Sequence, residues 1–253
     1  MKTLFVGQNS IHLESVDSTN SYASELLRQI ELSEGSIIYT FEQLNGRGQR
    51  GNSWESEPFK NVALSLVLYP KFLSVNQQFL LTKITSLAVA DLMAELLEDS
   101  VNPKEISIKW PNDIYVKGKK IAGILIENTL RESTLQSSII GIGININQLN
   151  FSTIQATSLA LLSSKEFKLM EVLNRWCEFF EARYLQLKTN KLESIDNSYL
   201  ERLYKLNQWS NYTSQETLFE GKIGGVSKVG KLQVELKNGE IKEFDLKEIA
   251  FEF

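Results

Sequence analysis

The chain has 253 residues, of which 42% are hydrophobic, and this is enough to bury one large core and a second, smaller one. A net charge of −4 implies no general affinity for nucleic acid, and no run of about 18 apolar residues is present to cross a membrane. We therefore expect a cytoplasmic protein that has neither nucleic acid nor a membrane as a partner.

The only histidine and the only cysteine limit the chemistry that the chain can perform. A histidine-rich metal site cannot exist, and a Ser-His-Asp or Cys-His mechanism would have to use His12, which has no motif around it. Cys177 stands beside Trp176 and close to Phe180, which favours a helix core position. The chemistry must therefore depend on lysine, arginine, carboxylate and amide groups, with or without Mg²⁺.

The first hundred residues predict two helices and two strands. Residues 17–20 are helix N-cap types that precede apolar residues at helical spacing, so a helix should begin there. Residues 36–41 and 61–69 are apolar runs that predict strands, the second of them buried. The apolar spacing between Phe79 and Leu96 indicates a long amphipathic helix.

The rest of the chain predicts a sheet, its covering helices and a small β-barrel. Strands are expected, with connections too short for crossover helices, at 106–110, 114–116, 120–127 and 134–147. Two helices between residues 165 and 206 should cover this sheet. Further short strands are indicated at 218–226, 231–236 and 241–244, with Asn238-Gly239 as a type I′ hairpin signal. We therefore predict an α+β fold, with a mixed, mainly antiparallel sheet covered by helices in a domain of residues 1–206 and a β-barrel domain of residues 207–253.

The loop Gly46-Arg47-Gly48-Gln49-Arg50-Gly51 combines three glycines with two arginines, a composition that favours anion binding. It also matches the G-x-G-x-x-G pattern of dinucleotide-binding turns, and a predicted strand precedes it. No helical stripe follows the loop, however, and Pro58 stands within seven residues of Gly51. The dinucleotide interpretation is therefore disfavoured, whereas a loop that binds phosphate or carboxylate and a simple solvated turn both stay open.

A second polar motif, Lys109-Trp110-Pro111-Asn112-Asp113, ends a predicted strand with a tight turn. A hairpin through Lys117-Gly118 should then bring Lys120 back beside Asp113. Because side chains alternate along a strand, either Lys119 or Lys120 must face inward, where a lysine is costly unless it meets an anion. Asn and Asp beside proline are also ordinary turn residues, so this motif by itself leaves both interpretations open.

Five segments, taken in chain order, resemble the motifs of the biotin-protein ligase family. They are Asp17-Ser18-Thr19-Asn20, the loop of residues 46–54, the motif of residues 109–113, Lys120-Ile121-Ala122-Gly123-Ile124-Leu125 and Gly141-Ile142-Gly143-Ile144-Asn145. The resemblance covers essentially the whole chain and implies a catalytic domain of the class II synthetase type followed by an SH3-like β-barrel. It also implies a two-step reaction. Biotin and ATP form biotinyl-5′-AMP, and a lysine of a biotin carboxyl carrier protein then accepts the biotin.

The resemblance further implies a role for each matching residue. The catalytic residues would be Lys120, Arg47 and Asp113, with Lys120 contacting the biotin carboxyl group and the α-phosphate of ATP, and Asp113 binding Mg²⁺. Contacts to biotin would come from Ser18, Thr19, Asn20, Gln43, Gly46, Arg47, Lys120 and Gly123. Contacts to ATP or the adenylate would come from Arg47, Gln49, Arg50, Trp54, Lys109, Asn112 and Asn145. Trp110 would be either a wall of the adenylate site or a core residue.

Two departures from the family pattern qualify these expectations. Gln49 stands where many members have an arginine that helps to retain the intermediate, so the role of position 49 is left open. Little chain precedes Asp17, so we expect no DNA-binding helix-turn-helix domain and no repressor function. The alternatives are a lipoate or octanoate ligase or transferase of the related fold, and a biotin-binding module without catalysis. A monomer and a homodimer are both compatible with the sequence.

Overall fold

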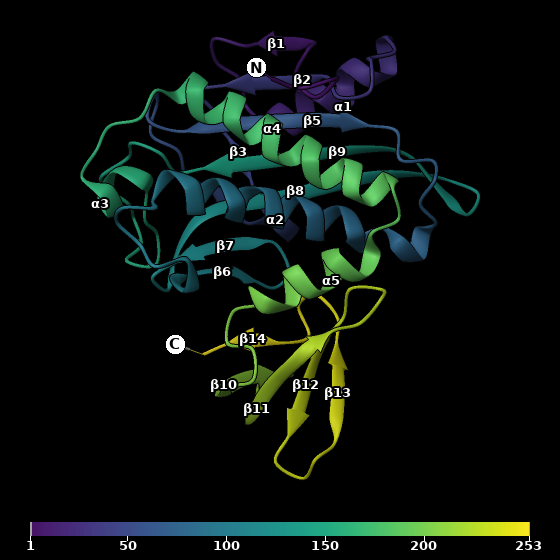
Figure 1. The fold of residues 1–253 in the computed structure, drawn as a ribbon, viewed down its shortest axis with the longest axis vertical. Helices are drawn as coiled ribbons and strands as arrows, with labels where there is room; N and C mark the ends of the chain where they lie inside the picture. The colour runs from purple at the N-terminus through teal and green to yellow at the C-terminus, as the bar shows by residue number, and fades with distance from the viewer. Residues whose placement is uncertain (1, 253) are drawn as a thin grey trace.

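The computed structural model describes residues 2–252, except for the side chain of Arg50. Its main feature is a seven-stranded sheet (Figure 1) whose strands lie in the order β1 (Ser10–His12), β2 (Ile37–Thr40), β5 (Val62–Leu68), β9 (Thr134–Ile144), β8 (Lys119–Arg131), β7 (Asp113–Val116) and β6 (Ile106–Lys109). Strands β1 and β2 are parallel, and the other neighbours are antiparallel. The predicted mixed, mainly antiparallel sheet is therefore confirmed.

Three helices cover one face of this sheet, as Figure 1 shows: α2 (Phe79–Leu96), α4 (Leu169–Lys188) and α5 (Leu192–Glu201). Alternate strand residues, such as Leu64 and Ile140, are fully buried in the core on this side. Cys177 on α4 is also fully buried, as expected, and burial raises the pKa of its thiol to about 12. Shorter helical turns are α3 (Leu159–Ser163), η1 (Gln49–Gly51), η2 (Val75–Gln77) and η3 (Pro103–Glu105).

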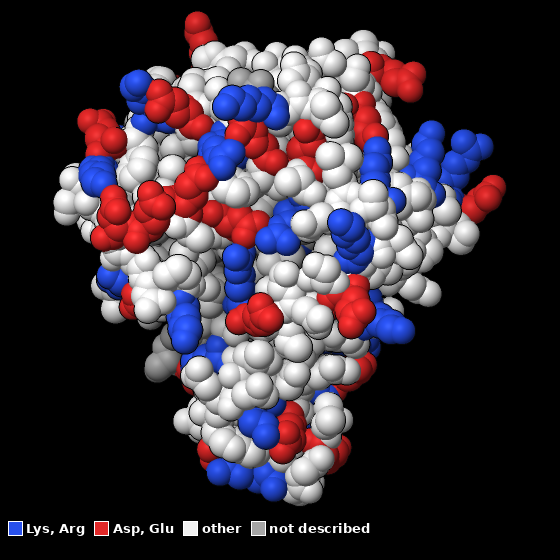
Figure 2. All heavy atoms as spheres, in the orientation of Figure 1, with Lys and Arg blue, Asp and Glu red and all other residues white. Residues whose placement is uncertain are grey.

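The outer surface of these helices carries interspersed charges of both signs (Figure 2). Ion pairs join α4 to α2, as in the contacts of Arg175 with Glu95 and of Arg183 with Asp91 at 2.7 Å. Asp91 also accepts from Arg202 at 2.7 Å, which ties the chain after α5 to α2. The ion pairs on this surface therefore stabilise the packing of the helices on one another. Basic and acidic side chains are mixed over it, and it is not uniformly basic.

Helix α1 (Thr19–Gln29) packs on the opposite face of the sheet. It begins where the sequence predicted, because the Ser18 side chain accepts a hydrogen bond from the Ser21 N–H. A small apolar cluster of Ala23, Ile38, Val67 and Ile139 attaches α1 to the sheet. The rest of this face, towards β7 and β8, is left to a loop that contains the short strands β3 (Gly46–Arg47) and β4 (Ser53–Trp54).

The C-terminal residues form a separate antiparallel sheet, drawn in yellow-green below the main sheet in Figure 1. Its strands lie in the order β13 (Ile241–Phe244), β12 (Leu232–Leu236), β11 (Thr217–Val226), β10 (Trp209–Ser214) and β14 (Ala250–Phe251). The indole N–H of Trp110, in the main sheet's 109–113 turn, donates to the Gly230 carbonyl at 2.9 Å. The Trp110 side chain thus lies in the junction between the two sheets.

The two predicted hairpin turns differ in outcome. Lys117 and Gly118 both have positive φ values, of 50° and 74°, so this hairpin is confirmed with a two-residue type I′ turn. The type I′ prediction for Asn238-Gly239 is wrong, because only Gly239 has a positive φ, of 83°. Leu236 and Glu240 close a three-residue loop there, in which the Asn238 side chain accepts from the Glu240 N–H at 3.0 Å.

Candidate active site

Glycines form the floor of a cavity on the α1 face of the sheet. Gly123 on β8 lies opposite Gly143 on β9, and Gly141 lies opposite Leu125. A Cβ atom on Gly143 would come within 2.4 Å of the Trp54 indole, and one on Gly141 within 2.3 Å of Asn20 Oδ1. These positions need glycine because other side chains lie directly on the backbone.

One end of the cavity is polar and belongs to the start of α1. The backbone N–H of Thr19 donates to Gln43 Oε1 at 3.0 Å, and Ser65 Oγ donates to Asn20 Oδ1 at 2.6 Å. The Asn20 amide also donates to the Leu125 carbonyl at 3.2 Å. Ser18, Thr19 and Asn20 are nearly buried, so this end offers hydrogen-bonding groups in a shielded place.

The opposite end depends on a β-bulge in β8. Ala122 pairs with Ile114 and Lys120 pairs with Tyr115, so Ile121 is an extra residue on β8. Ile121 and Ala122 are both fully buried, whereas simple alternation would place them on opposite faces. The bulge therefore places Lys120 on the same face of the sheet as Gly123 and Asp113.

Lys120 and Asp113 form an ion pair in the cavity, with Lys120 Nζ 2.7 Å from Asp113 Oδ1. The ammonium group lies 5.4 Å from the centre of a Trp54 ring. The Asn112 amide donates to the Ile124 carbonyl at 2.7 Å, which attaches the turn to β8. The predicted proximity of Lys120 to Asp113 is therefore confirmed.

The backbone of Lys120 is held by the segment of residues 155–157. Its N–H donates to the Gln155 carbonyl at 2.7 Å, and its carbonyl accepts from the Thr157 N–H at 2.9 Å. The buried Asn145 side chain donates to the Thr157 carbonyl at 3.0 Å. Asn145 is thus behind Lys120 and does not line the cavity.

Lys109 lies in the cavity wall that faces the C-terminal sheet. Its ammonium group donates to Tyr115 Oη at 3.2 Å and lies 5.0 Å from the ring centre of Phe251 on β14. Burial lowers the pKa of Lys109, the charge of Asp113 opposes this effect, and the charge of Lys120 adds to it. Both sheets therefore contribute to this wall, which also includes residues Leu246, Lys247, Ile249 and Ala250.

The glycine-rich loop covers the cavity but turns one arginine away from Lys120. Gln49, Gly48 and Trp54 line the cavity, whereas Gly46 packs against Gln43 and the Trp54 backbone. The Arg47 guanidinium forms an ion pair with Glu127 at 3.2 Å and so lies near the polar end. The side chain of Arg50 falls outside the described part of the chain.

Together these elements enclose a cavity of about 520 Å³. It brings together most of the residues singled out in the sequence: Ser18, Thr19, Asn20, Gln43, Arg47, Gln49, Trp54, Lys109, Asn112, Asp113, Lys120 and Gly123. Sequence reasoning missed Ser65, Glu127 and the segment of residues 246–251, which belong to no recognised motif. Between residues 2 and 252, no three His, Cys, Asp or Glu side chains are grouped to hold a metal ion, and no helix is suited to cross a membrane.

Comparison with known proteins identifies the family. The sequence profile of the Biotin/lipoate A/B protein ligase family matches residues 12–145, which is more than half of the chain. The chain belongs to this family. The resemblance expected from the five motifs is thereby confirmed, and so is the α+β fold class.

Individual relatives support the same assignment over a longer span. The chain is 31% identical over 247 residues to the bifunctional ligase/repressor BirA of Bacillus subtilis, covering 94% of this chain and 73% of the relative. A biotin--[acetyl-CoA-carboxylase] ligase of Paracoccus denitrificans is 35% identical over 136 residues, covering 53% of each chain. A solved biotin protein ligase of Aquifex aeolicus, in complex with biotin and ATP, superposes with a TM-score of 0.78 at 28% identity, covering 97% of this chain and 99% of that one. The family fold thus extends into the C-terminal sheet.

Proposed function

We propose that this chain is an ATP-dependent biotin-protein ligase, which forms biotinyl-5′-AMP and transfers biotin to a lysine of a biotin carboxyl carrier protein. One observation carries the proposal: a single cavity joins a shielded polar end at Ser18, Thr19 and Gln43 to a cationic end at Lys120. A long ligand with a polar head and an acidic tail fits this arrangement. The related Aquifex aeolicus ligase, which has the same fold, is known with biotin and ATP bound.

In the first step, a carboxylate oxygen of biotin attacks the α-phosphorus of ATP, and the bond to pyrophosphate breaks. The carboxylate is already ionised at neutral pH, so this step needs no general base. It needs positive charge at the phosphate, where negative charge is rearranged in the transition state. Lys120 supplies this charge from a position fixed by the β-bulge, the Asp113 ion pair and the 155–157 segment.

In the second step, the acceptor amine attacks the acyl carbon of the mixed anhydride, AMP leaves, and the amine gives up a proton. Asp113 is the nearest described carboxylate to Lys120 and stands as the candidate proton acceptor. Mg²⁺ prefers oxygen ligands and commonly combines one carboxylate with phosphates and water, which fits Asp113, the one acidic side chain among the described residues that line the cavity. Mg²⁺ would neutralise part of the triphosphate charge when it is bound there.

The polar end of the cavity favours biotin over lipoate or octanoate. The biotin ureido group has donors and acceptors that the side chains of Ser18, Thr19 and Gln43 can match. The Ser18 and Gln43 oxygens already accept hydrogen bonds from Ser21 and Thr19, but a dithiolane ring or an alkyl chain would offer no acceptor to the Ser18 hydroxyl or the Gln43 amide N–H, and each donor left without a partner in a shielded place costs about 1–3 kcal/mol. We place the reaction in the cytoplasm, carried out by a monomer or a homodimer.

The test is a labelling assay with ATP, Mg²⁺, biotin and a biotin carboxyl carrier domain. We expect pyrophosphate release that depends on biotin, and attachment of biotin to one carrier lysine. Lipoate in place of biotin serves as the control for the alternative substrate. Binding of biotin without pyrophosphate release would instead indicate a module without catalysis, and the proposal would then be rejected.

A further inference from the structure

The loop of residues 46–54 lies over the cavity, so the contacts that attach it decide how firmly the cavity is covered. At its base, the Leu44 N–H donates to the Val16 carbonyl at 2.9 Å, and the Asn45 amide donates to Asp17 Oδ1 at 2.7 Å. At its tip, the Gly48 N–H donates to the Asn52 carbonyl at 2.7 Å. This hydrogen bond is internal to the loop and does not attach it to the sheet, whereas the Trp54 indole at the end of the loop packs on Gly123 and Gly143.

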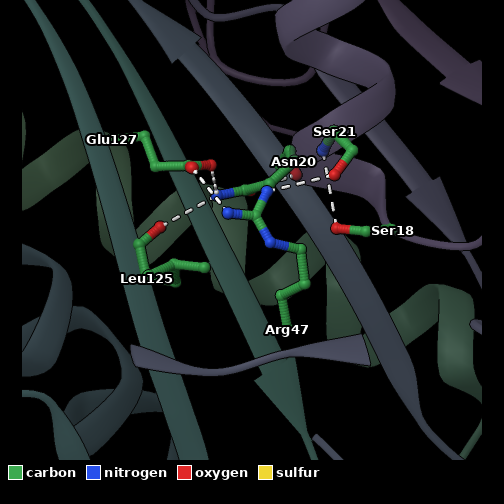
Figure 3. A network of polar contacts seen from close by, with 7 residues as sticks. Ser18, Asn20, Ser21, Arg47, Leu125 and Glu127 are labelled. Carbon is green, nitrogen blue, oxygen red and sulfur yellow. Dashed lines mark hydrogen bonds and ion pairs between the residues drawn. The ribbon is translucent and has the colours of Figure 1, made fainter. Parts of the chain in front are cut away.

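The Arg47 side chain makes a connection from the loop to β8 and α1 (Figure 3). One guanidinium nitrogen donates to Glu127 Oε1 at 3.2 Å, and another donates to Ser21 Oγ at 3.1 Å. The second carboxylate oxygen of Glu127 accepts from the Asn20 amide at 2.8 Å. Glu127 therefore joins the loop to the polar end of the cavity.

The contact between Arg47 and Glu127 lies far from Lys120, the residue expected to contact the α-phosphate. Glu127 is seven residues beyond Lys120 on β8, and one of these residues is taken up by the bulge. At roughly 3.3 Å per residue, the two Cα atoms are about 20 Å apart along the strand. A guanidinium group bound to Glu127 is thus at the opposite end of the cavity from the Lys120 ammonium group.

We propose that Glu127 is a positioning residue, and that the Arg47–Glu127 ion pair, called here the loop anchor, holds the loop closed over bound biotin. This inference rests on the proposed ligase function. The Arg47 guanidinium binds Glu127 and so fixes the position of the loop, and the backbone of the loop covers the biotin. Asn20 keeps its orientation without Glu127, because Ser65 and the Leu125 carbonyl also bind its amide group.

The expected size of the effect follows from the exposure of the pair. The Arg47 side chain is 51% exposed and that of Glu127 is 36% exposed, and such pairs contribute little in isolation. We therefore expect loss of the loop anchor to raise the KM for biotin and the dissociation rate of biotinyl-5′-AMP by about fivefold. The kcat for adenylation should change by less than about twofold, because Lys120 and Asp113 are untouched.

The experiment compares Glu127→Gln, Glu127→Asp and the charge-reversed double variant Arg47→Glu/Glu127→Arg with Arg47→Glu alone. Biotin-dependent pyrophosphate release gives KM and kcat, and chase of labelled biotinyl-5′-AMP gives its dissociation rate. Glu127→Gln should show the fivefold changes, Glu127→Asp should recover part of them, and the double variant should recover most of the loss caused by Arg47→Glu. Glu171→Gln is the matched control, since it removes an exposed ion pair between Lys168, which precedes α4, and Glu171 in the first turn of α4, on the opposite side of the sheet.

Two outcomes would contradict the proposed role of the loop anchor. The first is that Glu127→Gln has a normal KM for biotin and a normal dissociation rate of biotinyl-5′-AMP. The second is a double variant that is as impaired as Arg47→Glu and impaired in kcat, which would place the Arg47 guanidinium on the phosphates. Failure of the unaltered protein to form biotinyl-5′-AMP would reject the proposed function itself, so the two failures are distinguishable.

Discussion

A single methyl group on Gly143 should displace Trp54 and so damage the adenylation site. The Cβ atom of Gly143→Ala would lie 2.4 Å from Cε2, 2.6 Å from Nε1 and 2.7 Å from Cζ2 of the Trp54 indole. Carbon atoms in contact are normally about 3.5–4.0 Å apart, so the indole must move by roughly 1 Å or more. The backbone of Gly143 is held between β5 and β8 and cannot move instead.

The consequence for activity follows from what Trp54 contacts. Its indole lies over the glycine floor and beside the ammonium group of Lys120. A misplacement of about 1 Å near a reacting centre can cost up to about 100-fold in rate. We expect Gly143→Ala to lower kcat/KM for ATP by about 10- to 100-fold, and to lower the free energy of unfolding by about 1–3 kcal/mol through overpacking.

The assay is biotin-dependent pyrophosphate release at varied ATP, with chemical denaturation to measure stability. Gly224→Ala is the matched control, because a Cβ atom there meets nothing within 4 Å and the residue lies outside the left-handed region. The double variant Gly143→Ala/Trp54→Phe should recover part of the lost stability, since the smaller ring leaves room for the methyl group. Full adenylation activity in Gly143→Ala would refute the argument, and so would an equal loss in Gly224→Ala.

Three further predictions concern Lys120, Cys177 and Trp110. Lys120→Ala should lower the adenylation rate by about 10² to 10³, or roughly 3–4 kcal/mol, while the unfolding midpoint shows that the fold is kept; near-normal pyrophosphate release would contradict the role of Lys120. Cys177 should not react with an aromatic disulfide reagent at pH 8 in the folded protein and should react fully in denaturant, because burial raises its pKa to about 12 and excludes the reagent; rapid labelling of the folded protein would disprove this. Trp110→Phe removes the hydrogen bond to the Gly230 carbonyl and should lower the free energy of unfolding in urea by about 1 kcal/mol. Trp209→Phe, at an exposed position, should have a smaller effect, and an equal loss would contradict the assignment.

The sequence determined most of the elements, because each depends on residues close together in the chain. Ser18 begins α1 through a hydrogen bond to an N–H three residues away, and Lys117-Gly118 makes a two-residue turn. The strands β1, β3, β4, β10 and β14 and the helix α3 were not predicted, since they are short or lack a clear apolar period. The Asn238-Gly239 turn was predicted with the wrong type, because loop length there is set by the pairing of β12 with β13.

The five motifs likewise determined the family and most of the cavity lining. The predicted hairpin also placed Lys120 beside Asp113, but only the tertiary structure decided which way the side chains of the cavity turn and which distant partners they meet. The bulge at Ile121 turns Lys120 towards Asp113, although strict alternation from Gly123 would turn it away. Arg47 has its ion-pair partner in Glu127, eighty residues later, and no local pattern announces that contact. Local hydrogen bonding and periodicity are properties of a few consecutive residues, whereas the partner of a side chain is set by the packing of segments that are distant in the chain.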